Sequence, residues 1–190
     1  MKKDIILAGV GGQGILSIAA IIGSAAISKG MYLKQAEVHG MSQRGGDVSS
    51  NLRISTEEIY SDLIPVGKAD LIISVEPMEV LRYLPFLSPN GWLITATNPF
   101  INIPNYPELD AIMAEIKKVK NHIAIDADAI GKEIGARPNM IILGAASPYL
   151  EIEFETLEAA VRDIFGSKGD AVVNSNLEAL KTGRKFAEGK

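Results

Sequence analysis

The sequence predicts an α/β protein: a three-layer Rossmann-like domain with a mostly parallel sheet, helices on both of its faces and an antiparallel hairpin at one edge. Two observations predict this class. Strand-like apolar segments alternate with helix-like segments along the chain, as in proteins built from βαβ units. The first apolar strand also ends in a glycine-rich turn that leads directly into an apolar helix, over residues 4–29. No internal repeat or linker interrupts the 190 residues, so we expect one domain over residues 1–190.

Nearly continuous apolar runs indicate strands that are buried on both faces, as in a parallel sheet. Helices are indicated by apolar residues on one face, by Pro77 in a first turn, and by Gly30 and Gly135 at helix ends. Strands are expected at residues 4–8, 32–38, 69–75, 92–95 and 123–126, with a turn at 89–91 and an irregular, proline-rich segment at 98–107. Helices are expected at residues 12–29, 77–83, 109–120, 127–134, 155–165 and 170–186, with another that starts at about residue 139 and stops before Pro148.

One segment departs from the parallel pattern. From Val48 to Ile54 apolar residues alternate with polar ones, which favours a half-exposed, antiparallel strand. A short strand at residues 59–61 is expected to pair with it across the polar residues 55–58. These two strands form the predicted edge hairpin.

Composition excludes several functions. The chain is 47% hydrophobic and 22% charged, and its net charge of −4 argues against a general nucleic-acid binder. It has no cysteine, so it lacks the thiolates that form disulfides or ligate iron–sulfur clusters. His39 and His122 stand apart from metal-spaced carboxylates, so no metal site is expected. The longest apolar run is too short to span a membrane, and the first strand begins at Asp4 without a preceding signal peptide. We therefore expect a cytoplasmic protein.

The glycine turn is the first candidate site. Gly9, Gly11 and Gly14 fit the G-x-G-x-x-G spacing, in which backbone N–H groups approach an anion at a helix N-terminus. The same turn also serves as a tight strand–helix crossover that binds nothing. A dinucleotide site needs an acidic residue at the end of the second strand, about 20 residues further on. Glu37 lies 23 residues after Gly14, so this spacing fits only roughly and NAD is not the favoured ligand.

The second candidate site is the cluster from His39 to Gly46, where a polar triplet precedes paired glycines. A solvated loop explains its polarity but not the two glycines beside one arginine. Paired glycines allow close backbone approach, and the planar fork of Arg44 suits a carboxylate or phosphate. The predicted cofactor-binding residues are Gly9, Gly11, Gly12, Gln13, Gly14, Glu37, Ser42, Gly45 and Gly46, and the candidate active-site contributors are Arg44, His39 and Gln43.

Acidic residues at two other strand ends are weaker candidates. Glu76 and Glu79 flank the start of a predicted helix, where acids also stabilise the helix dipole. Asp126 and Asp128 follow another strand, and Asp126 is equally suited to cap a helix. Neither pair has a spacing that indicates a hydrolytic carboxylate pair.

Together, the runs Gly9–Gly14 and Glu37–Gly46 resemble the gamma-type subunits of the 2-oxoacid:ferredoxin oxidoreductases. The resemblance continues through Asp70–Pro77 and Asn139–Gly144, so it covers most of the chain. The stretch Met41-Ser42-Gln43 before Arg-Gly-Gly places the chain nearest the indolepyruvate branch, where the matching chain is the beta subunit. The resemblance thus implies a single pyruvate/ketoisovalerate oxidoreductase gamma-type catalytic domain.

The resemblance also implies a division of labour. Enzymes of this family oxidatively decarboxylate a 2-oxoacid with coenzyme A (CoA) to acyl-CoA and CO₂, and reduce ferredoxin. Thiamine diphosphate, Mg²⁺ and [4Fe–4S] clusters would lie on a larger alpha subunit, and this chain would bind none of them and be inactive alone. Arg44 and the backbone of Gly45 and Gly46 would face the partner's cofactor or an anionic substrate, and the glycine turn would hold a phosphate-bearing group such as CoA or support that loop. Two other functions stay open: a free-standing NAD- or flavin-dependent enzyme, and a noncatalytic interface subunit. No membrane or nucleic-acid partner is expected.

Overall fold

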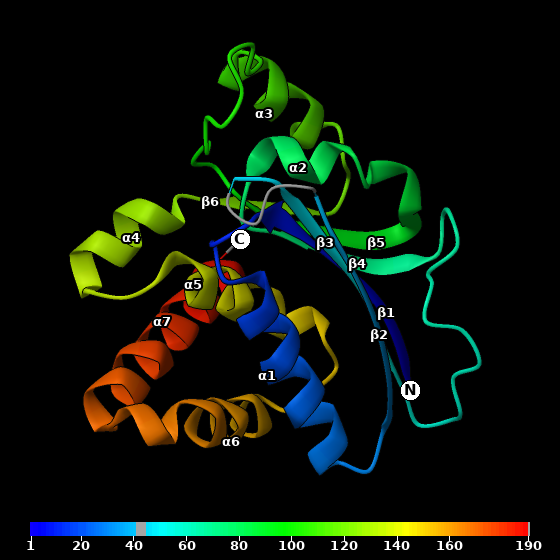
Figure 1. The fold of residues 1–190 in the computed structure, drawn as a ribbon, viewed down its shortest axis with the longest axis vertical. Helices are drawn as coiled ribbons and strands as arrows, with labels where there is room; N and C mark the ends of the chain where they lie inside the picture. Colours follow the sequence, from blue (N-terminus) through cyan, green and yellow to red (C-terminus); the bar gives the residue numbers. More distant parts are fainter. Residues whose placement is uncertain (41–44, 190) are drawn as a thin grey trace.

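A computed structural model describes residues 1–40 and 45–189 and places six strands in one sheet, in the order β2-β3-β1-β4-β5-β6 (Figure 1). The strands are β1 (Lys2–Val10), β2 (Tyr32–His39), β3 (Asp47–Ser55), β4 (Ala69–Ser74), β5 (Leu87–Ala96) and β6 (His122–Ile125). Strands β1, β4, β5 and β6 run parallel, whereas β3 is antiparallel to both of its neighbours, β1 and β2. The predicted mostly parallel sheet is confirmed. An antiparallel hairpin does lie at one edge, but it is formed by β2 and β3 rather than by the predicted strands at 48–54 and 59–61.

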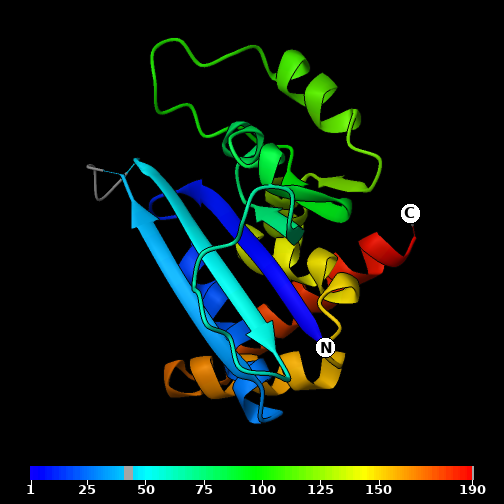
Figure 2. The same ribbon diagram turned by 90° about the vertical axis from the view of Figure 1, so that its right-hand side faces the viewer.

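Helices cover the sheet on two sides (Figures 1 and 2). The helices are α1 (Ile15–Ser28), α2 (Pro77–Leu81), α3 (Leu109–Lys117), α4 (Ala127–Ile134), α5 (Pro138–Ala146), α6 (Phe154–Phe165) and α7 (Asp170–Glu188). Helices α1, α5, α6 and α7 pack on one face around the larger core, while α2 and α3 pack on the other face around a smaller one. The three-layer architecture is therefore as predicted.

Strand β1 shows why its sequence is apolar throughout. Ile5 and Leu7 belong to the larger core, whereas Ile6 between them belongs to the smaller core on the opposite face. Because successive side chains of a strand point to opposite faces, a strand buried on both sides needs an uninterrupted apolar run. Complete burial of each such side chain contributes about 1.5–3 kcal/mol to folding.

The prediction that the strand at 48–54 is half-exposed is wrong, because β3 is buried along most of its length. Arg53 is buried and donates from Nε to Asp4 Oδ1 at 2.7 Å, which pairs two charges across β3 and β1. Its Nη1 also donates to the carbonyls of Ser61 and Leu63. These bonds hold residues 56–68 across the outer face of β1 and β3, so the polar side of β3 is covered by backbone acceptors (Figure 2).

Two further local predictions are wrong. Residues 59–61 form no strand, since β3 already has β1 and β2 as its two neighbours. Residues 89–91 belong to β5 rather than to a turn, and the register against β4 shifts there. At Gly91 a Cβ would lie 2.8 Å from the carbonyl oxygen of Ala69, so only glycine lets the two backbones approach this closely.

The predicted helices all exist, with ends that differ by a few residues from the expected ones. Helix α1 begins at Ile15 instead of Gly12, since Gly14 is its N-cap. Helix α4 ends as predicted at Gly135, which adopts the left-handed conformation with φ 67°. Within the described residues, none of the helices has the length and apolar character that crossing a bilayer requires.

Candidate functional site

The glycine turn joins β1 to α1 at the carboxyl edge of the parallel strands. Gly9 and Gly14 are explained there by contacts and backbone conformation within the protein. A Cβ at Gly9 would lie 2.5 Å from Val75 Cγ2, and one at Gly14 would lie 2.5 Å from Asn139 Nδ2. Gly14 also has a left-handed φ of 84°, which disfavours a side chain. Crowding at Gly9 and the backbone conformation at Gly14 therefore account for these two glycines without a ligand.

The side chain of Gln13 closes the turn. Its Oε1 accepts a hydrogen bond from the backbone N–H of Val10 at 2.8 Å, and its Nε2 donates to the carbonyl of Val75 at 3.4 Å. The amide thus links the end of β1 to the residue that follows β4. Gln13 was predicted to bind a cofactor, and in this structure its amide is engaged by backbone groups.

Gly12 differs from the other glycines of the turn. Its φ is 100°, yet no heavy atom of the described residues comes within 4 Å of the position of a Cβ. It is exposed at the N-terminus of α1, whose first turn contains no acidic side chain. The positive end of a helix dipole favours an anion at such a position.

The end of the β2–β3 hairpin lies against the glycine turn. The N–H of Gly11 donates to the carbonyl of Gly46 at 2.8 Å. Asn102, from the segment after β5, donates from Nδ2 to the carbonyl of Gly45 at 2.7 Å. The two predicted glycine clusters, far apart in sequence, are therefore adjacent in space. Of the predicted site residues, Ser42, Gln43 and Arg44 lie outside the described residues.

Glu37 and His39 lie on β2, on the side that faces α1. His39 Nε2 is 3.2 Å from Glu37 Oε2, and Gln35 Nε2 donates to Glu37 Oε1 at 2.5 Å. Strand β3 stands between β2 and β1, so Glu37 is two strand spacings, about 10 Å, from the strand that carries the glycine turn. In a dinucleotide site these strands are neighbours, and this arrangement therefore argues against a ribose-binding role for Glu37.

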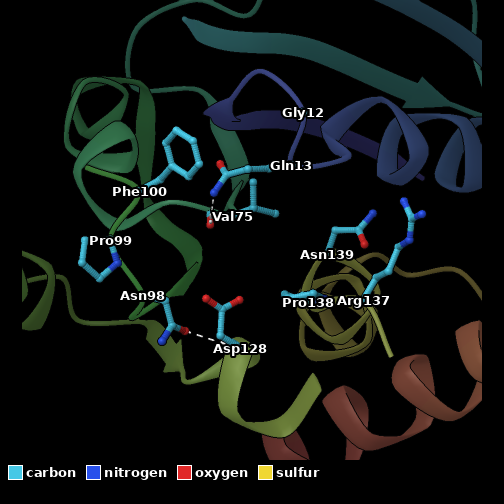
Figure 3. Close-up of a pocket in the computed structure, with 10 residues that line it drawn as sticks. All are labelled: Gly12, Gln13, Val75, Asn98, Pro99, Phe100, Asp128, Arg137, Pro138 and Asn139. Atoms are coloured by element: carbon cyan, nitrogen blue, oxygen red, sulfur yellow. Dashed lines mark hydrogen bonds between the residues drawn. The ribbon is translucent and has the colours of Figure 1, made fainter. Parts of the chain in front are cut away.

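A pocket of about 270 Å³ opens at the carboxyl ends of β1, β4 and β5 (Figure 3). Open α/β sheets bind ligands at this edge. The pocket is lined by Gly12, Gln13, Val75, Asn98, Pro99, Phe100, Asp128, Arg137, Pro138 and Asn139. Three helix N-termini meet there: those of α1 and α5, whose first turns carry no acidic residue, and that of α4, whose first turn carries Asp128. With the exposed guanidinium of Arg137, the starts of α1 and α5 make one wall of the pocket electropositive.

A second, more apolar pocket of about 260 Å³ lies on the other side of Gly12, between α1 and the β2–β3 hairpin. His39 lines this pocket, together with Leu16 and Val48. Gly12 therefore separates the two pockets and borders both. The structure thus brings His39 to the glycine turn, whereas Glu37 is bonded to its neighbours on β2.

Glu76 is an internal anchor rather than a group that faces the pocket. It is completely buried, and its Oε2 caps α2 by accepting from the N–H of Glu79 at 2.7 Å. Its Oε1 accepts from the N–H of Phe100 at 3.2 Å and from the hydroxyl of Tyr106. Burial raises the pKa of the Glu79 carboxyl, and the guanidinium of Arg82, 2.8 Å away, opposes that shift.

The acids after β6 divide between two roles. Asp126 caps α4, as the sequence allowed, by accepting from the N–H of Ala129 at 2.9 Å. This bond, with one from the amide of Asn98, lowers the pKa of the Asp126 carboxyl. Asp128 is exposed and lines the pocket opposite Arg137 and Asn139 (Figure 3).

Sequence reasoning missed most of the pocket residues, among them Asn98, Phe100 and Arg137. Asn98 and Phe100 follow the end of β5, a position where pocket residues of parallel sheets collect. Arg137 precedes Pro138 at the start of α5, and no local pattern indicates that this helix begins beside the glycine turn. The described residues contain no group of three or more His, Cys, Asp or Glu side chains that could hold a metal ion.

Comparison with known proteins gives a consistent result. The family model described as pyruvate ferredoxin/flavodoxin oxidoreductase matches residues 4–186. The chain is 39% identical to the indolepyruvate oxidoreductase subunit IorB of Archaeoglobus fulgidus, over 96% of this chain and 94% of that one. It is 37% identical to the IorB subunit of Methanothermobacter thermautotrophicus, over 96% of each chain.

Solved structures share the fold. The gamma subunit of a keto/oxoacid ferredoxin oxidoreductase from Geobacter sulfurreducens superposes with a TM-score of 0.71 at 21% identity, over 99% of each chain. A 2-oxoglutarate:ferredoxin oxidoreductase from Magnetococcus marinus superposes with a TM-score of 0.78 at 24% identity. All of the present chain corresponds to only 31% of that longer chain. The same fold therefore occurs both as a separate chain and as part of a longer one.

Proposed function

We propose that this chain, which belongs to the pyruvate ferredoxin/flavodoxin oxidoreductase family, is the smaller subunit of an enzyme that oxidatively decarboxylates an arylpyruvate such as indolepyruvate. Its relatives at 39% and 37% identity are named as indolepyruvate oxidoreductase subunits, and it spans almost their full length. The products would be an acyl-CoA, CO₂ and reduced ferredoxin. We keep the cytoplasmic location as a prediction from the sequence.

One observation carries this proposal for the site: both glycine clusters and the starts of α1 and α5 meet at one edge of the sheet. The bond from Gly11 to the Gly46 carbonyl fixes the hairpin on the turn. Arg137 adds a positive charge beside the turn. A wall of exposed backbone with a guanidinium beside it suits a phosphate-bearing ligand.

CoA is the ligand that we propose for this edge. Its phosphates would lie near Gly12 and Arg137, where N–H groups and a guanidinium are available as donors. Arg44, which lies outside the described residues, would face the substrate or the partner's cofactor from the hairpin. The Magnetococcus marinus enzyme, which contains this fold in 31% of its chain, was solved with 2-oxoglutarate, CoA and succinyl-CoA bound, which supports the choice of ligand.

The redox groups would belong to the partner subunit. The chain has no cysteine to ligate a [4Fe–4S] cluster. Held by an alpha subunit, thiamine diphosphate and the clusters would supply the decarboxylation and electron-transfer chemistry. The present chain would bind CoA, orient it and exclude water from the covered pocket.

Reconstitution tests the proposal. The chain is co-expressed with a thiamine- and cluster-bearing alpha subunit, and ferredoxin reduction is followed with indolepyruvate and CoA. We expect a stable complex that reduces ferredoxin, and no turnover by either chain alone. Turnover by the isolated chain with NAD⁺, or equal turnover by the partner without this chain, would contradict the proposal.

The predicted role of Arg44 is tested in the same complex. Arg44→Ala should lower turnover at least tenfold, because it removes a charge-assisted contact worth about 1.5–3 kcal/mol. Arg162→Ala is the matched control, since Arg162 is exposed on α6, away from the pocket-lining residues. Equal turnover of the two variants would exclude a role for Arg44.

A further inference from the structure

Residues 97–107, between β5 and α3, form an uncharged segment with exposed hydrophobic side chains. They include no Asp, Glu, Lys, Arg or His. Because 22% of the whole chain is charged, about two charged residues would be expected among these eleven. Phe100, Ile101 and Ile103 are 44%, 71% and 39% exposed. Depletion of charge with exposed aromatic and aliphatic groups is typical of the core of a protein–protein interface.

Hydrogen bonds hold this segment in place, although it has no regular secondary structure over most of its length. The buried carboxylate of Glu76 accepts from the N–H of Phe100 and from the hydroxyl of Tyr106. Asn102 donates to the carbonyl of Gly45 in the hairpin. Three prolines restrict the backbone further. A surface ordered in advance loses less conformational entropy when a partner binds.

The segment stands at the rim of the candidate site. Pro99 and Phe100 line the pocket beside Gly12 and Gln13 (Figure 3). In Figure 2 it is the green loop that extends beyond the carboxyl edge of the sheet before α3. Any subunit that covers the pocket must therefore meet Pro99 and Phe100, which the exposed Ile101 follows directly.

The 56–68 segment provides a contrast on the same molecule. Tyr60, Leu63 and Val66 are also exposed there. However, four of its thirteen residues carry a charge, at positions 57, 58, 62 and 68. It lies across the outer face of β1 and β3, and none of its residues lines the pocket. Its exposed side chains are therefore not expected to contact a subunit that covers the pocket.

We propose that residues 99–105 dock on an uncharged, apolar surface of the partner subunit that carries the cofactors, with Ile101 at the centre of the contact. The inference rests on the proposed function, because that function requires such a partner. Two features indicate that the partner of this segment is the cofactor-bearing subunit. The segment has no charge to attract a charged surface, and it is continuous with the pocket that this subunit would cover. Docking there would enclose the bound CoA between the two subunits.

The test measures affinity for the complete partner subunit. The full chain is titrated with alpha subunit loaded with thiamine diphosphate and clusters, and the dissociation constant is measured for wild type and for Ile101→Asp. We expect Ile101→Asp to raise it at least tenfold, because a charge would be buried in an apolar contact. Val66→Asp is the matched control, since Val66 is 67% exposed and lies in the 56–68 segment. Its dissociation constant should stay within twofold of wild type.

Thermal unfolding of both variants separates docking from folding, and we expect melting temperatures within about 2 °C of wild type, as for exposed substitutions. If both variants bind as wild type does and the complex is active, the docking surface is elsewhere and only this inference fails. If Ile101→Asp instead abolishes self-association of the chain and leaves partner affinity unchanged, the occupant is a second copy and the inference also fails. If the wild-type chain binds no such partner, the proposed function fails with it.

Discussion

Two sets of glycines in this protein serve opposite purposes. At the crossing of α5 and α7, a Cβ at Gly144 would lie 2.1 Å from the Leu180 carbonyl oxygen, and one at Gly183 would lie 1.9 Å from that of Ile141. At the glycine turn, Gly12 has a φ of 100° and no heavy atom of the described residues within 4 Å of a Cβ position. The first pair allows two backbones to touch, whereas Gly12 leaves backbone open to solvent.

This difference separates residues whose identity is explained by contacts within the fold from residues that are exposed and free to contact a ligand. Gly9, Gly14 and the side chain of Gln13 are explained by contacts within the protein. Gly12 and Arg137 are exposed and line the pocket, with no such internal explanation. The glycines of one motif therefore do not all belong to a binding site. The role of each position follows from the atoms around it.

The largest effect is expected at the helix crossing. Gly183→Ala should lower the free energy of unfolding by about 3 kcal/mol or more, because backbone atoms rather than a flexible side chain occupy the space of the Cβ. Urea unfolding measures it. Gly166→Ala is the control, since Gly166 has a helical φ of −55° and no heavy atom of the described residues within 4 Å. A loss at Gly183 no larger than at Gly166 would mean that α5 and α7 are less closely packed.

Gly12→Ala should separate stability from ligand binding. A side chain at a left-handed position costs about 1–2 kcal/mol, and the same cost is expected for Gly30→Ala, where φ is 72° and the surroundings are also open. Only Gly12→Ala should also raise the KM for CoA in the reconstituted complex, by about tenfold or 1.4 kcal/mol. Urea unfolding and steady-state kinetics give the two numbers. Equal KM values for both variants would assign the turn to structure alone.

Arg137→Ala should weaken CoA binding without affecting the fold. Removal of one charge-assisted hydrogen bond costs about 1.5 kcal/mol or more, so the KM for CoA should rise roughly tenfold, and less at high salt. Arg162→Ala, on the exposed side of α6, should leave the KM unchanged. The contrary outcome is a wild-type KM for CoA that rises with salt and is matched by the KM of Arg137→Ala at every salt concentration. In that case a cation other than Arg137 binds the phosphates.

The order of strands and helices was predictable because hydrophobic periodicity decides it. The buried run of β1, the helix ends at Gly30 and Gly135 and the antiparallel direction of β3 all follow from local pattern. The burial of β3 does not, because Arg53 is covered by carbonyls of Ser61 and Leu63, which lie eight and ten residues further on in an irregular segment. Polar residues that pair with distant backbone resemble exposed ones in the sequence.

The candidate site was predictable in part for the same reason. The two glycine clusters stand out locally, and the structure places Gly11 against Gly46. Arg137 and Phe100 reach the pocket through the crossovers of a parallel sheet, which bring the ends of separate strands together. Glu76 was a candidate by its position at a strand end, but its carboxylate caps α2 and accepts two hydrogen bonds that hold the 97–107 segment.

The smallest effect tests the same distinction on two neighbouring acids. Asp126→Ala removes the N-cap of α4 and should cost about 1 kcal/mol, whereas Asp128→Ala removes a pocket-facing carboxylate from the same helix and should cost less than about 0.5 kcal/mol. The hydrogen bonds to Asp126 lower its pKa in the folded state, so its contribution is present above the unfolded value of 3.8 and is lost as pH falls through the folded value. Unfolding at several pH values should therefore bring Asp126→Ala and wild type together in acid. A pH-independent difference would mean that the lost cap acts through packing rather than through the charged carboxylate.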